Sequence, residues 1–83
     1  MTTGTTASGT YYLFNKKDQD VPIVFVHGVG LTHEIWQPQL QFFNYHSTLA
    51  YDILGHGKSS LEKQVISFDD FSHQLLKLLD HLN

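Results

Sequence analysis

Cysteine is absent from this 83-residue sequence, which excludes disulfide bridges and thiolate metal sites but leaves the compartment open. Arginine is absent as well, and charged side chains make up only 16% of the residues. The five lysines are spread along the chain, so they form no basic stripe that could bind nucleic-acid phosphates. We therefore expect no nucleic-acid partner.

Long apolar runs are missing too. The longest, residues 23–26, is far shorter than the roughly 20 residues needed to cross a bilayer. Residues 1–9 have neither the positive charge nor the apolar run of a secretory signal. We therefore expect a cytoplasmic protein with no membrane partner.

Residues 2–9 contain only threonine, glycine, alanine and serine. Such a segment has too little apolar surface to offset the entropy cost of ordering it. The composition predicts a disordered leader over residues 1–9, followed by one α/β unit over residues 10–83. Because α/β folds commonly need about 200–250 residues to close a domain, that unit is expected to be incomplete.

The hydrophobic pattern predicts about three strands and two helices in this unit. A strand is predicted at 22–27, where residues 23–26 are apolar without alternation, which is typical of a strand covered on both faces of a parallel sheet. Leucine and phenylalanine repeat at helical spacing after Ser67, and Asp70 completes a variant capping box. The remaining predicted elements are strands at 10–14 and 48–54 and a short helix at 34–43 with Pro38 in its first turn.

Two glycine-containing blocks follow the two predicted buried strands. The first is His27-Gly28-Val29-Gly30, and the second is the run from Asp52 to Ser59, with sequence DILGHGKS. Trp36 lies between them, at the start of the intervening helix. Together, and in this order, they resemble the N-terminal signature of the α/β-hydrolase fold superfamily, in particular esterase- and lactonase-like serine hydrolases. The resemblance extends over about residues 21–82.

The resemblance implies a role for the first block in an oxyanion hole, where backbone N–H groups stabilise the negative charge of an acyl-transfer intermediate. The donor would be the N–H of Val29, Gly28 and Gly30 would give the loop its conformational freedom, and His27 would brace the loop.

The second block is expected to be structural rather than catalytic. Asp52 would accept hydrogen bonds from N–H groups of its own turn, Gly55 and Gly57 would allow the reversal, and Ser59 would make local hydrogen bonds.

No catalytic nucleophile is predicted within these residues. The nucleophile elbow of the family has the pattern G-x-S-x-G. Ser59 follows Gly57 at the right offset, but Leu61 stands in place of the second glycine, and no other serine matches. The resemblance therefore places the nucleophile, the acid and the base after Asn83, and the chain alone is expected to be inactive.

The functional expectation is an N-terminal segment of a hydrolase that acts on small ester or lactone substrates through a Ser-His-Asp mechanism, with no cofactor. Gly30 favours ester or lactone cleavage, because a proline there would point to epoxide hydrolases or dehalogenases; the exact reaction stays open. The alternative is a non-catalytic remnant or interaction module. In either case, unpaired strand edges are expected to cause marginal stability, self-association or dependence on a partner.

Three other interpretations have less support. A phosphate-binding loop ending in Gly57-Lys58-Ser59 would need glycine where Asp52 stands. The six histidines show no helical metal-ligand spacing, so no metal site is expected. The leucine-rich face of the last helix is expected to be core rather than a binding surface.

Overall fold

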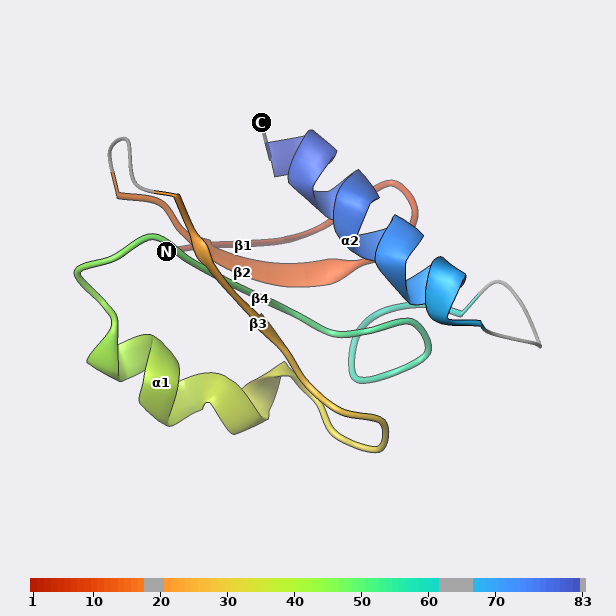
Figure 1. Ribbon diagram of the computed structural model, residues 1–83, viewed down its shortest axis with the longest axis horizontal. Helices are drawn as coiled ribbons and strands as arrows, with labels where there is room; N and C mark the ends of the chain where they lie inside the picture. Colours follow the sequence, from red (N-terminus) through yellow and green to blue (C-terminus); the bar gives the residue numbers. More distant parts are fainter. Residues whose placement is uncertain (18–20, 62–66, 83) are drawn as a thin grey trace.

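The computed structural model describes residues 1–17, 21–61 and 67–82, and it arranges them as a four-stranded mixed sheet with helices on both faces (Figure 1). The elements in chain order are β1 (Thr2–Thr5), β2 (Tyr11–Asn15), β3 (Ile23–Val26), the 3₁₀ helix η1 (His33–Trp36), α1 (Gln37–Phe42), β4 (Thr48–Tyr51) and α2 (Phe68–Leu82). The predicted α/β architecture is confirmed.

The strands lie in the order β1-β2-β4-β3. β2 is antiparallel to both of its neighbours, while β3 and β4 are parallel, with Val24 opposite Leu49 and Val26 opposite Tyr51. β4 is therefore an inner strand, and all four of its residues are buried. This confirms the prediction of a buried strand near residues 48–54.

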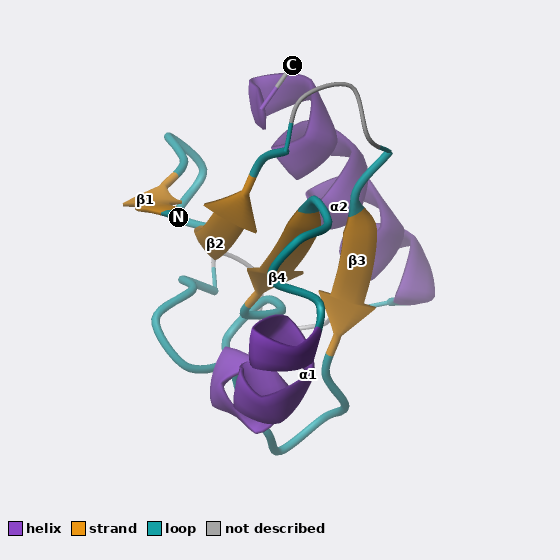
Figure 2. Ribbon diagram, turned by 90° about the vertical axis from the view of Figure 1, so that its left-hand side faces the viewer, coloured by secondary structure: helices purple, strands orange, loops and turns teal. Residues whose placement is uncertain are grey.

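The two faces of the sheet pack against different helices (Figure 2). Val24 and Leu49 join the cluster that contains Leu78 of α2. Phe25, the next residue of β3, points the other way, and its ring lies 5.1 Å from that of Trp36. Because successive side chains of a strand alternate between faces, α2 covers one face and the η1–α1 segment covers the other.

The start of α2 follows the sequence prediction closely. The Asp70 carboxylate accepts the N–H of Ser67 at 2.9 Å, and the Ser67 hydroxyl accepts the N–H of Asp70 at 3.4 Å. This is the reciprocal pattern of a capping box, with aspartate in place of the usual glutamate. No helix in the described ranges is both long enough and apolar enough to span a membrane.

The expected disordered leader differs from the structure. Thr2–Thr5 form β1, which pairs in antiparallel register with β2, so the sheet has four strands rather than about three. The turn that follows is closed by the Thr6 hydroxyl, which accepts the N–H of Thr10 at 3.1 Å. Main-chain pairing orders this segment without the apolar side chains whose absence motivated the prediction.

β3 is covered less completely than expected, although Val24 and Phe25 pack on opposite faces. It is the last strand of the sheet, and Ile23 and Val26 are 36% and 48% exposed. The predicted strand is confirmed, but β4 rather than β3 has the fully buried position.

We propose that the open edge of β3 makes this chain self-associate. A sedimentation-velocity series should show a concentration-dependent shift to larger species. Val26→Lys should displace that shift to higher concentration, because a charge on an edge strand opposes edge-to-edge pairing. Gln39→Lys on exposed α1 adds the same charge away from the edge, so an equal effect of both substitutions would contradict the edge model.

Candidate functional site

The loops that follow β3 and β4 meet at one end of the sheet (Figure 1). β3 and β4 are adjacent and parallel, so their carboxyl ends lie at the same edge. The two glycine-containing blocks begin there, one at His27 and the other at Asp52. The topology therefore brings together two segments that are separated in the sequence by η1, α1 and β4.

The first loop forms a tight turn over residues 28–31. The carbonyl of Gly28 accepts the N–H of Leu31 at 3.2 Å, and Gly30 has a φ of 88°. A positive φ at the third position is the mark of a type II turn, which requires glycine or asparagine there. Gly30 thus uses its conformational freedom, whereas Gly28 does not have a positive φ.

Val29 occupies the second position of this turn, and its side chain is 80% exposed. The Leu31 N–H is bonded within the turn, and the Gly30 N–H donates to the Nε2 atom of His56 at 2.9 Å. In the described parts of the chain, the Val29 N–H has no hydrogen-bond partner. The loop therefore presents an unbonded main-chain donor at Val29.

His27 is almost fully buried and connects the two loops. Its Nε2 accepts the N–H of Ile53 at 3.0 Å, so its Nδ1 carries the proton and donates to the carbonyl of Gly28 at 2.8 Å. With both ring nitrogens engaged by main-chain groups, the ring is neutral and fixed in one tautomer. His27 is thus placed to support the turn.

Asp52 is fully buried at the start of the second loop. Its Oδ2 accepts the N–H of Lys58 at 2.9 Å, across the reversal that contains Gly55 and Gly57. Both glycines have positive φ, and a Cβ at Gly57 would collide with the Asp52 carboxylate. The loop is therefore wrapped directly around this carboxylate.

The other carboxylate oxygen reaches the start of η1. Asp52 Oδ1 accepts the main-chain N–H of His33 at 2.7 Å and contacts its ring Nδ1 at 2.9 Å. Burial acts to raise the pKa of Asp52, but the hydrogen bonds from Lys58 and His33 and the charge of the His33 ring outweigh it and hold the pKa below its ordinary value of 3.8. Asp52 is therefore held as a carboxylate that fixes both loops and η1.

A pH dependence follows from this lowered pKa. Because the pKa of Asp52 is lower in the folded state than in the unfolded state, its contribution to stability is complete above about pH 4 and is lost as the pH falls through the folded pKa. Urea unfolding in steps below pH 4 should show a falling free energy of unfolding. Asp52→Asn should make the free energy of unfolding depend less steeply on pH below pH 4. If the dependence is the same in the variant, other carboxyl groups cause it.

Ser59 is buried and is committed to structural hydrogen bonds. Its hydroxyl donates to the main-chain carbonyl of Asp52 at 2.6 Å and accepts the N–H of Tyr11 at 3.0 Å. These bonds tie the second loop to β2. The hydroxyl is thus directed to main-chain groups, not to a histidine that could activate it as a nucleophile.

Gln74, His33 and His56 are three participants that sequence reasoning did not identify. The buried Gln74 of α2 donates from Nε2 to the Asp52 carbonyl at 3.0 Å and accepts the Leu54 N–H at 3.0 Å. His33 and His56 bond to residues 19 and 26 positions away. A glutamine on a predicted amphipathic helix is a weak sequence signal for a buried hydrogen bond. No sequence signal near His33 or His56 indicates the distant residues that they bind.

Comparison with known proteins identifies the family to which this arrangement is related. Residues 23–83 match the profile described as "Alpha/beta hydrolase family". The chain is 33% identical over 63 residues to the (E)-2-((N-methylformamido)methylene)succinate hydrolase of Acinetobacter baylyi, covering 75% of this chain and 24% of that protein. It is 32% identical over 62 residues to 3-oxoadipate enol-lactonase 1 of the same organism, covering 74% and 23%.

Two further similarities cover almost the whole chain. The non-heme chloroperoxidase CPO-A1 of Kitasatospora aureofaciens is 34% identical over 82 residues, which is 95% of this chain and 30% of that protein. The crystal structure of a hydrolase from Pseudomonas aeruginosa superposes with a TM-score of 0.81 at 26% identity, covering 98% of this chain and 32% of that one. The chain thus spans less than a third of the length of each of these relatives.

Proposed function

Because this chain belongs to the alpha/beta hydrolase family, we propose that it supplies the oxyanion loop of a hydrolase that cleaves small ester or lactone substrates. The nucleophilic serine, the histidine base and the acid would come from residues outside these 83. The serine oxygen would attack the substrate carbonyl, and negative charge would develop on the former carbonyl oxygen. A preorganised N–H group directed at that oxygen lowers the barrier.

The observation that carries this proposal is the unbonded N–H of Val29. This N–H lies in a turn whose next two N–H groups are both engaged, three residues after β3 ends at Val26. The main chain supplies the donor, so the exposed valine side chain is compatible with the role. Among the described residues, the Ser59 hydroxyl at the same end of the sheet does not compete as a nucleophile, since it is used within the fold.

The substrate class rests on the named activities of the relatives. A succinate-derivative hydrolase and an enol-lactonase are among them, and both names describe hydrolytic activity on small molecules. Gly30 also supports this class, because a proline at that position would point to epoxide hydrolases or dehalogenases. The observed positive φ at Gly30 is one that proline cannot adopt.

The second candidate function is a non-catalytic interaction module. The edge of β3 favours it, because in the described ranges β3 pairs with β4 on one side alone, and a strand with a free edge can bind another chain by adding a strand to the sheet. This candidate requires no chemistry at Val29.

We expect the 83-residue chain alone to hydrolyse neither p-nitrophenyl acetate nor a simple lactone above buffer and heat-denatured controls. A nucleophile and base are required for acyl transfer, and the proposal places both elsewhere. The rate should be measured spectrophotometrically over a range of chain concentrations. A rate that rises in proportion to folded chain would contradict the proposed division of the active site.

A further inference from the structure

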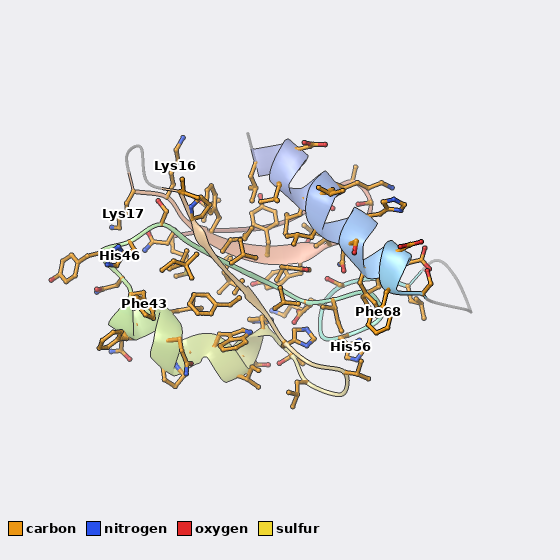
Figure 3. All side chains as sticks on the ribbon, viewed as in Figure 1. Lys16, Lys17, Phe43, His46, His56 and Phe68 are labelled. Carbon is orange, nitrogen blue, oxygen red and sulfur yellow. The ribbon has the colours of Figure 1, made fainter. Side chains whose placement is uncertain are left out.

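His56 makes a hydrogen bond that crosses from the second loop to the first. The side chain of His56 is labelled in Figure 3. Its Nε2 accepts the N–H of Gly30 at 2.9 Å, and its Nδ1 lies 2.9 Å from the carbonyl of Leu54. A carbonyl can only accept, so the proton of the ring is on Nδ1, and Nε2 is left with a lone pair for Gly30. His56 is therefore held by its own loop in the tautomer that can bind the other loop.

His27 makes the same kind of connection in the opposite direction. It belongs to the first loop and accepts the N–H of Ile53 in the second. The two rings lie side by side, with centroids 5.6 Å apart. Each loop thus contributes one histidine that binds a main-chain N–H of the other. His27 also donates to the carbonyl of Gly28 at the start of the 28–31 turn, whereas His56 binds the N–H of Gly30 inside the turn.

The particular N–H that His56 binds belongs to the central peptide of the turn. A type II turn converts to a type I turn when this peptide, between Val29 and Gly30, rotates by about 180°. Glycine at position 30 permits either state, so the freedom that allows the observed turn also allows it to change. A rotated peptide would present the Val29 carbonyl oxygen to the His56 lone pair, which is unfavourable for two acceptors.

We propose that His56 is a positioning residue that holds the 28–31 turn in its type II form and keeps the Gly30 N–H engaged, so that the Val29 N–H is the unbonded donor of the turn. The catalytic meaning of this role rests on the proposed function, while the structural role does not. Besides the bond to His56, the turn is closed by the 3.2 Å main-chain bond from Leu31 to the carbonyl of Gly28, which also accepts the Nδ1–H of His27. Loss of the His56 bond should raise the population of the rotated state about three- to tenfold.

NMR spectroscopy of the uniformly ¹⁵N-labelled 83-residue chain tests the contact directly. A scalar coupling through the hydrogen bond should connect the amide nitrogen of Gly30 with Nε2 of His56. The ring nitrogen shifts of His56 should also report the neutral tautomer with its proton on Nδ1. Absence of the coupling in the folded chain, or the opposite tautomer, would overturn the proposal without any substitution being made.

Substitutions test the consequence. His56→Leu removes the acceptor, whereas His56→Gln offers a carbonyl oxygen near the position of Nε2. The nuclear Overhauser effect between Val29 Hα and the Gly30 amide proton, which is strong in a type II turn, should weaken in His56→Leu and be retained in His56→Gln. His73→Leu, on the exposed side of α2, is the matched control and should leave it unchanged.

The outcomes separate the two proposals. If the nuclear Overhauser effect between Val29 and Gly30 is as strong in His56→Leu as in the unsubstituted chain, the role of His56 is overturned. The same holds if the effect weakens equally in His56→Leu and His73→Leu. A turn that depends on His56, combined with a Val29 N–H that proves irrelevant to hydrolysis, supports the role of His56 and removes only the oxyanion assignment.

Discussion

Val29→Pro should lower kcat about 100- to 1,000-fold in a hybrid enzyme that carries this loop, because removal of one oxyanion donor has an effect of that size. The hybrid exchanges the aligned segment of the 3-oxoadipate enol-lactonase for that of this chain, which is 32% identical to it. Proline has no N–H, and its fixed φ suits the second position of a type II turn, where Val29 lies. The substitution therefore deletes the donor while preserving the turn.

Val29→Ala is the matched control. It shortens a side chain that is 80% exposed and leaves the N–H in place, so its kcat should stay close to that of the unsubstituted hybrid. KM should change little in either variant, because the donor acts on charge that develops in the transition state. Equal kcat values for the proline and alanine variants would refute the oxyanion assignment.

The sequence was informative wherever a signal is local. Ser67 and Asp70 are three residues apart, and their capping box forms as the spacing predicts. Residues 48–51 and 23–26 form strands, as the sequence predicts. The order of the strands decides which of these two segments is the inner strand of the sheet. The residues of the two segments do not by themselves predict that order. For β3, the predicted strand is therefore confirmed, but the predicted full burial is wrong, because Ile23 and Val26 are exposed.

β1 shows the opposite limitation. Composition predicted disorder for residues 1–9 because it measures side-chain burial, and these side chains bury little. The strand is held by main-chain pairing with β2 and by the Thr6–Thr10 turn, and threonine is well suited to strands. A polar segment can thus be ordered by main-chain hydrogen bonds to the edge strand with which it pairs, here β2.

The candidate site shows the same division between local and distant partners. The bond from Lys58 to Asp52 closes within a single loop, and the motif predicted such a bond. The bonds of His33 to Asp52 and of His56 to Gly30 span 19 and 26 residues. They exist because parallel β3 and β4 end at one edge, so they become visible only once the fold is known.

Asp52→Asn should have the largest effect on stability, lowering the free energy of unfolding by about 2–4 kcal/mol. The side chain is fully buried and accepts main-chain N–H groups on both oxygens, from His33 and from Lys58. An asparagine of the same shape must direct its NH₂ group at one of these donors, which leaves that donor unsatisfied and opposed. Urea unfolding followed by far-UV circular dichroism at neutral pH measures the loss.

Asp80→Asn provides the reference for this measurement, because it removes the same charge from an exposed position near the end of α2. It should change the free energy of unfolding by less than about 0.5 kcal/mol. The comparison therefore separates the buried hydrogen bonds of Asp52 from the general effect of reducing the net charge. Equal stabilities for the two variants would mean that the carboxylate does not organise the two loops, and the preorganisation of the Val29 turn would then need another cause.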